Sequence, residues 1–151
     1  MLEWGAKKDG LVPILLDGEP VATADPEFWR EGAELVIGGE TWRFERDGKE
    51  RVARSARNPR AVLRATKPNW WRDAWTVTGD GVTYEIGSEG FLGRTQRVLR
   101  DGQRVGTAHT AGAWSSRPVL DVDPSVPPVH QLFLLWISHI IRKRNAAAAA
   151  G

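Results

Sequence analysis

The chain has 151 residues and no cysteine, which excludes disulfides, thiolate metal ligands and cysteine nucleophiles and suits a reducing cytoplasm. A chain of this length forms one domain that can bury enough apolar surface to fold without cross-links. The net charge is only +2, but the charges are spread unevenly along the chain.

A strand, a glycine-containing tight turn and a second strand recur four times. Asp-Gly between two β-rich runs is a strong hairpin signal, because a type I′ turn needs a positive φ at both central residues. The pattern therefore predicts an antiparallel meander. The expected hairpins are 11–23 with the turn Asp17-Gly18, 41–54 with Asp47-Gly48, 74–86 with Gly79-Asp80-Gly81, and 97–108 with Asp101-Gly102.

Apolar and polar residues alternate within these strands, as in Trp42-Arg43-Phe44-Glu45, so one face is buried and the other faces water. Two further strands are expected at 60–66 and 113–122. Sheets of this size usually curl, split or close, and closure removes the exposed edges. We therefore predict a mainly β fold, a closed antiparallel barrel of about 10–12 strands.

The C-terminal part behaves differently. After a proline-rich stop at 123–128, residues 129–141 predict a helix that continues to residue 143. Nine of the 13 residues in 129–141 are apolar and lie on nearly every face, so this helix must be buried in protein or in lipid. It reaches roughly 20 Å, which is short of the ~30 Å hydrocarbon core of a membrane.

Burial inside the barrel is therefore the preferred interpretation of this helix, as the centre of a single domain over residues 1–145. The cations Arg142, Lys143 and Arg144 are expected at its C-terminal end, where they would complement the helix dipole. Residues 146–151 are expected to be a frayed or added tail. The predicted core positions on the helix are Leu132, Phe133, Trp136, Ile137 and Ile140.

A β-barrel meander threaded by an apolar C-terminal helix resembles the tubby C-terminal-like superfamily, which includes tubby proteins, phospholipid scramblases and LURP-one-related proteins. The order of features over 62–141 is similar to the LURP-one-related branch. These features are Leu63-Arg64-Ala65-Thr66-Lys67, Asp73-Ala74-Trp75-Thr76-Val77, Gly79-Asp80-Gly81, Tyr84-Glu85-Ile86-Gly87, Arg100-Asp101-Gly102 and the helix.

The resemblance implies the fold first. Tubby domains bind phosphoinositides through basic surface residues, and scramblases act at membranes, so it also implies an anionic lipid as a partner. The scramblase branch carries acidic residues around its terminal helix that are proposed to bind calcium. This helix ends in Arg142-Lys143-Arg144 instead, so the resemblance does not imply calcium-driven activity here.

The middle of the chain is the most basic part. Residues 1–41 carry 3 basic and 9 acidic side chains, 42–72 carry 10 and 3, and the remainder 8 and 7, which gives −6, +7 and +1. A planar guanidinium suits phosphate, and tryptophan beside a cation suits a membrane interface, a phosphate-bearing headgroup or stacked bases. The candidate anion-binding residues are Arg51, Arg54, Arg57, Arg60, Arg64, Lys67, Trp70, Trp71 and Arg72.

Each candidate also has a plain structural alternative. The arginine run fits an ordinary solvated face. Trp71 and Trp75 fit packing in the barrel, with Lys67 and Arg72 merely solvated. If Trp70 and Trp71 both lie in a strand, however, one of them points outward, because successive strand residues face opposite ways.

The spacing of residues does not predict a catalytic site or a metal site. His130 and His139 are nine residues apart and so lie on opposite sides of a helix, where each is expected to be structural. Asp121 and Asp123 lack the further oxygen ligands of a cation site, and 87–93 lacks the ending of a phosphate-binding loop. We predict no catalytic residue, no metal and no cofactor.

The expected function is therefore non-enzymatic binding of anionic lipid headgroups by a cytoplasmic protein without a transmembrane span, peripheral at the inner membrane face. A nucleic-acid partner is not expected. A protein-interaction module of unknown partner stays open. A lipocalin-like carrier of small ligands would need an empty barrel, and the C-terminal helix argues against one.

Overall fold

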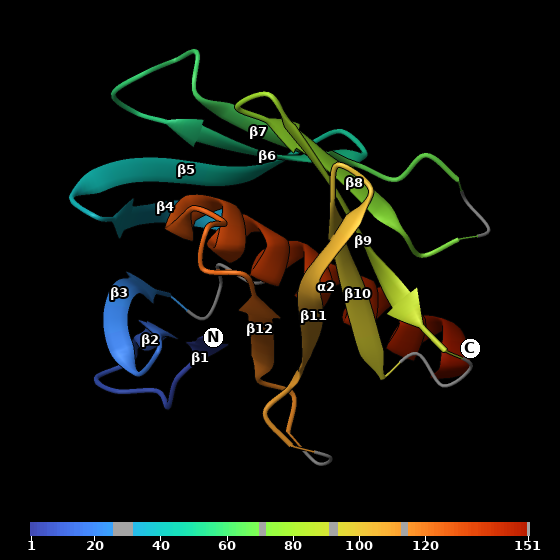
Figure 1. Ribbon diagram of the computed structural model, residues 1–151. Coiled ribbons are helices and arrows are strands. Elements are labelled where there is room, and N and C mark those ends of the chain that lie inside the picture. The colour runs from blue at the N-terminus through green and yellow to red at the C-terminus, as the bar shows by residue number, and fades with distance from the viewer. Residues whose placement is uncertain (26–31, 70–71, 91–93, 113–114, 151) are drawn as a thin grey trace.

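The computed structural model describes residues 1–25, 32–69, 72–90, 94–112 and 115–150, and it confirms the mainly β fold. One antiparallel sheet curls into a nearly closed barrel around one helix (Figure 1). Its strands are β1 (Leu2–Trp4), β2 (Val12–Leu16), β3 (Glu19–Ala24), β4 (Gly32–Ile37), β5 (Glu40–Asp47), β6 (Glu50–Ser55), β7 (Val62–Thr66), β8 (Trp75–Gly79), β9 (Val82–Glu89), β10 (Thr95–Arg100), β11 (Gln103–Thr110) and β12 (Pro118–Val122). The helix is α2 (Pro128–Ala150).

The 12 strands follow the order β3-β2-β1-β12-β11-β10-β9-β8-β7-β6-β5-β4. Chain neighbours pair from β1 to β3 and from β4 to β12, and β1 joins these two runs by pairing with β12, where Leu2 lies opposite Leu120. Strands β3 and β4 are the two edges of the sheet; they lie side by side without a ladder between them. The barrel is therefore closed except at this seam.

Three of the four predicted turns have the expected geometry. Both central residues take a positive φ at Asp17 (50°) and Gly18 (85°), and the turns at 80–81 and 101–102 do the same. The second hairpin differs. Asp47 is the last residue of β5, and the turn is Gly48-Lys49, with a positive φ of 61° at Gly48, as in a type II′ turn.

Two strands were not predicted, and two begin later than expected. Apolar and polar residues alternate only weakly in the three-residue β1 and in the edge strand β4. Only hydrogen bonding to the neighbouring strands therefore defines these two strands. Strand β7 begins at Val62, because 58–61 form a turn in which the Asn58 carbonyl accepts from the Ala61 N–H at 2.9 Å. Strand β12 begins at Pro118, because the Ser115 hydroxyl accepts from the Arg117 N–H at 3.1 Å in the preceding loop.

The apolar helix forms the centre of the core, as predicted. Leu132, Phe133, Trp136 and Ile137 are at most 1% exposed, and Ile140 is 8% exposed. The strands contribute inward-facing aromatic side chains that pack on them. The Phe44 ring, for example, lies 5.6 Å from that of Phe133 and 5.9 Å from that of Trp136 between centroids.

The helix is longer than predicted at its C-terminal end. It continues through residues 146–150, which are helical and exposed, so the expectation of a frayed tail was wrong. Alanine has the highest helix propensity, and a helix that is already nucleated by burial extends readily into an alanine run. Arg142, Lys143 and Arg144 consequently lie more than a turn before the end of the helix, not at its terminus as expected.

Each end of the helix is tied to the barrel by polar contacts. At the helix-start end, near Pro128, the buried His130 ring lies between Tyr84 Oη (2.8 Å from Nδ1) and Asp80 Oδ2 (2.7 Å from Nε2). At the helix-exit end, where exposed residues begin at 143, Asn145 Nδ2 donates to Asp73 Oδ2 at 2.9 Å. The structural role expected for His130 is confirmed.

Replacing Trp136 with alanine is expected to lower the free energy of unfolding by about 3–5 kcal/mol, because the indole is fully buried at the centre of the core. Ser138→Ala, two residues away, is the control. The Ser138 hydroxyl is buried and has no hydrogen-bond partner among the described residues, so its loss should change stability by less than about 1 kcal/mol. Urea denaturation measures both. Native-state hydrogen exchange in which α2 opens before the strands would contradict this account.

Candidate functional site

The structure does not gather the predicted anion-binding residues on one surface. Arg57 and Arg60 are exposed in the β6–β7 loop at the helix-start end, whereas Lys67 and Arg72 follow β7 at the opposite, helix-exit end. The reason is that β7 crosses the barrel between them. Trp70 and Trp71 lie outside the described residues.

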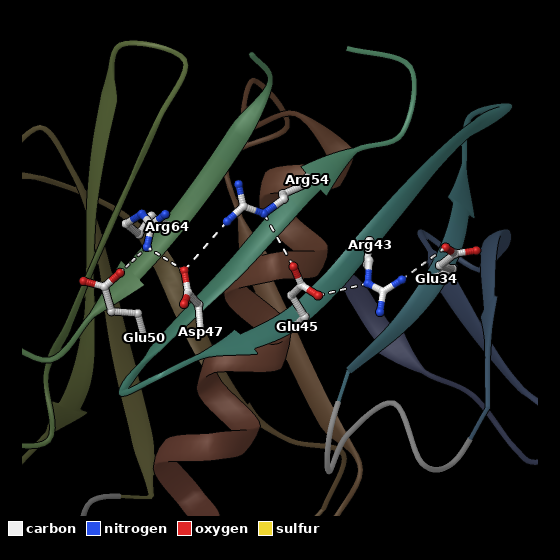
Figure 2. Close-up of polar contacts among 7 residues, drawn as sticks. All are labelled: Glu34, Arg43, Glu45, Asp47, Glu50, Arg54 and Arg64. Carbon is white, nitrogen blue, oxygen red and sulfur yellow. Dashed lines mark hydrogen bonds and ion pairs between the residues drawn. The ribbon is translucent and has the colours of Figure 1, made fainter. Parts of the chain in front are cut away.

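Two of the predicted arginines belong to an ion-pair ladder on the outer wall (Figure 2). Arg54 lies 3.5 Å from Glu45 and 3.7 Å from Asp47, and Arg64 contacts both Asp47, at 3.4 Å, and Glu50. The hydrogen bond that Arg64 donates to the Glu50 carboxylate raises the pKa of Arg64. Their charges are compensated locally, so this wall is not the free basic face that the linear charge count suggested.

The ladder continues across β5 to the edge strand β4. Arg43 stands directly opposite Arg54 in the β5–β6 register, and Glu45 contacts both of them. Arg43 also reaches Glu34 at 3.7 Å. The carboxylate of Glu45 thus bridges two arginines that would otherwise repel each other, and such exposed ion pairs stabilise the sheet modestly.

The strongest concentration of uncompensated cations lines a cavity of about 610 Å³ at the helix-exit end, which we call the basic cavity. The β5–β6 hairpin supplies Arg46 and Lys49, the end of β7 supplies Lys67, and α2 supplies Arg144. Glu50 is the one carboxylate in the lining, and Arg64 already pairs with it.

Arg51 lies beside this cavity and faces the barrel interior. Its side chain is buried, and its guanidinium lies 5.9 Å from the centroid of the Trp75 ring, while that of Arg144 lies 5.0 Å from the same ring. Burial lowers the pKa of Arg51, and the positive charges of Arg144 and Arg46 lower it further. Three guanidinium groups therefore converge at the helix exit.

None of the ion pairs between described residues involves Arg46, Arg51 or Arg144. Arg46 Nε donates to the Gly48 carbonyl at 2.9 Å, and Arg51 Nη1 donates to the Glu50 carbonyl at 3.1 Å. These contacts orient the side chains without neutralising their charge. The arrangement can therefore accept an anion, and it offers donors of the planar geometry that phosphate prefers.

Sequence reasoning found only part of this cavity. Arg51 and Lys67 were predicted, but Arg46, Lys49 and Arg144 were not. The first two flank the turn of a predicted hairpin, which places them at one end of the barrel. No sequence signal places Arg144 beside that turn, because the helix meets it only through tertiary packing.

A hydrogen-bonded group fixes the direction in which the helix leaves the barrel. Asp73 accepts hydrogen bonds from the backbone N–H of Ser88, at 3.0 Å, from the Ser88 hydroxyl and from Asn145. Burial would raise the pKa of Asp73, but these bonds and the charge of Lys67 outweigh it and lower the pKa. Because Asn145 follows Arg144 directly, this contact holds Arg144 at the basic cavity.

His139, on the same helix, lies in a cationic setting. Burial lowers its pKa to about 4, and Lys143 and Arg142 add to the effect. Trp4 of β1 packs against the imidazole with an interplanar angle of 74° and 6.1 Å between ring centroids. The ring is therefore neutral near pH 7.

Comparisons with family models, curated proteins and solved structures found no match for this chain. The likeness to the tubby C-terminal-like superfamily therefore stays a prediction. No helix in the described part of the chain is long and apolar enough to cross a membrane.

The depressed pKa of His139 predicts a loss of stability in acid. Unfolded histidine titrates near 6.5 and the folded ring near 4, so the unfolded chain binds the proton first as the pH falls. Titration of His139 does not affect the free energy of unfolding above about pH 6.5, and it lowers this free energy by about 3 kcal/mol at pH 4. Urea denaturation at pH steps between 7 and 4 measures the loss, and His139→Asn should remove this part of it. If the wild-type protein and His139→Asn lost the same stability as the pH falls, the assignment of this loss to His139 would be contradicted.

Proposed function

We propose that this protein is a non-enzymatic binding domain that holds a phosphate-bearing anion in the basic cavity, carried either by a membrane lipid headgroup or by a soluble molecule. The observation that carries the proposal is the convergence of Arg46, Arg51 and Arg144, none of which forms an ion pair with a described carboxylate. Like charges held together at a partly buried position repel one another, so this arrangement favours binding of a multivalent anion.

The chemistry of the lining fits phosphate. Guanidinium groups donate paired hydrogen bonds to phosphate oxygens, and the ammonium groups of Lys49 and Lys67 add compact charges at the rim. A cavity of about 610 Å³ accommodates a sugar-phosphate or inositol-phosphate headgroup. The guanidinium groups of Arg51 and Arg144 lie over the indole of the buried Trp75.

The charge distribution along the helix axis supports the lipid source of this anion. The helix-exit end carries the cations Lys67, Arg72, Arg94, Arg117, Lys143 and Arg144 beside the carboxylates Asp73 and Glu89, whereas the helix-start end carries the carboxylates Asp17, Glu19, Glu40, Asp80, Asp101 and Asp123 beside the cations Arg57 and Arg60. An anionic membrane attracts the first end and repels the second, with about 1 kcal/mol for each cation near the surface. In this proposal the protein is peripheral at a cytoplasmic membrane face.

The filled interior of the barrel argues against a lipocalin-like carrier. The buried residues of α2 and of the strands form one continuous apolar cluster, so the space that a lipocalin-like carrier uses for its ligand is filled by the helix. The protein-interaction alternative has no specific observation in its favour and enters as an outcome of the experiment.

The test is a charge reversal at the basic cavity with a matched reversal at the opposite end. Lys49→Glu combined with Arg144→Glu should weaken binding about 100-fold or more, because each lost charge-assisted contact contributes about 1.5–3 kcal/mol. Arg57→Glu combined with Arg60→Glu makes the same change in net charge at exposed positions of the helix-start end and should leave binding nearly unchanged. Thermal unfolding of both double variants checks that the fold is intact.

Two arms identify the source of the anion. Calorimetry with inositol trisphosphate measures the soluble ligand, and co-sedimentation with phosphatidylcholine vesicles, with and without phosphatidylserine or phosphatidylinositol bisphosphate, measures the lipid. Both signals should weaken as salt shortens the Debye length. Wild-type protein that binds neither probe at low ionic strength, or equal losses in the two double variants, would overturn the proposal and favour a protein-interaction module.

A further inference from the structure

A second cavity, of about 370 Å³, lies beside α2 at the helix-exit end. We call it the Arg142 cavity. Its wall includes His139, Arg142 and Lys143 from the helix, and Arg94, Thr110 and Ser116 from the strands and loops around it. Two residues along a helix are about 200° apart, so Arg142 and Arg144 point to opposite sides, and the two cavities are separate. Ala146 is the one apolar residue among the eight described residues that line the Arg142 cavity, so its apolar surface comes largely from carbon atoms of polar side chains.

Arg142 is held rigidly but not neutralised. Its Nη1 donates to the Arg94 carbonyl at 3.0 Å and its Nη2 to the Ala108 carbonyl at 3.1 Å. The Nε atom is buried and has no hydrogen-bond partner in the part of the chain that the structure describes. Burial also lowers the pKa of Arg142, which shows that its charge is partly desolvated.

No carboxylate lines this cavity among the described residues. Arg94 and Lys143 are exposed at its rim, and neither they nor Arg142 take part in any ion pair between described side chains. Three cations therefore surround a small apolar space. A single anionic group with an apolar body complements this arrangement better than a phosphate does, because phosphate would leave the apolar wall uncovered.

The neutral His139 completes the wall. Among the described residues, the charged groups that line the cavity with it are Arg142 and Lys143 on its own helix and Arg94 before β10, whereas Trp4 of β1, Thr110 of β11 and the loop residue Ser116 are uncharged. Burial, followed by the positive charges of Lys143 and Arg142, keeps the imidazole unprotonated by lowering its pKa, and an anion in the cavity offsets the contribution of these charges. Protonation of His139 and occupation of the cavity therefore favour each other.

We infer that the Arg142 cavity binds the carboxylate of a small amphipathic acid, with the carboxylate at Arg142 and the carbon chain along the apolar wall. The inference does not depend on the basic cavity or on phosphate binding, because the two sites share no cation. Binding also couples to proton uptake at His139, so the affinity for an anion that stays ionised rises as the pH falls from 7 toward 5.

The experiment follows the His139 ring by NMR in the full chain, with the signal assigned through His139→Gln. Hexanoate and hexanesulfonate should give saturable shifts, while hexanol, which lacks the charge, and inorganic phosphate, which lacks the chain, should bind at least ten-fold more weakly. Hexanesulfonate stays ionised throughout, so its tighter binding at lower pH reports the coupling to His139. The pH dependence should disappear in His139→Gln, in which the backbone amide signals of the residues that line the cavity report binding in place of the lost ring signal.

Arg142→Gln should weaken hexanoate binding at least ten-fold. Because Arg142 also bonds to strand carbonyls, the exposed Lys143→Gln and Arg94→Gln provide a second test that does not disturb the barrel, each with a several-fold loss. Arg57→Gln, at the helix-start end, is the control and should change nothing. Three results would each overturn the inference. They are hexanol that binds as tightly as hexanoate, no saturable shift of the His139 signal, and an equal loss of binding in Arg57→Gln and Lys143→Gln. Phosphate binding at the basic cavity is measured separately with Lys49→Glu and Arg144→Glu.

Discussion

The requirement to bury an apolar helix on all sides is the constraint on which this structure depends. One layer of sheet covers only one face of such a helix, so the sheet must curl around it. The 12-stranded meander does so, and β1 completes the circuit by pairing with β12. Aromatic side chains such as Phe44 and Trp136 fill the space between the two layers. The core therefore belongs to the helix and the barrel together, and neither would be stable alone.

The same helix brings charge to the place where the barrel opens. Once α2 passes the last strands its side chains are no longer covered, and Arg142 to Arg144 follow directly after the apolar run. Arg144 turns toward the β5–β6 hairpin and Arg142 toward the start of β10. The basic end of the molecule is thus built from segments far apart in the chain. The contact between Asn145 and Asp73 fixes this arrangement.

The net charge of a segment of the sequence differs from the uncompensated charge that the folded surface presents to a partner. Residues 42–72 carry an excess of seven positive charges, yet Arg54 and Arg64 face carboxylates of β5 and β6 on the outer wall. Arg51, three residues before Arg54, faces inward and has no such partner, because successive strand residues point to opposite sides. Among the described residues, the cations without an ion-pair partner include Arg46 and Arg51 beside the β5–β6 turn and Arg142 to Arg144 on the helix.

The sequence by itself determined the elements whose signals are local. The Asp-Gly turns near Asp17, Asp80 and Asp101 need only their own φ angles, and the all-round apolar pattern at 129–141 permits only burial, so the barrel and its central helix were predictable. The turn at Gly48, the edge strand β4 and the helical alanine tail were not, because pairing and nucleation from neighbouring structure decide them. The candidate sites depended still more on tertiary structure. Whether an arginine is compensated follows from strand register and helix direction, and both are set by packing between segments that the sequence does not place side by side.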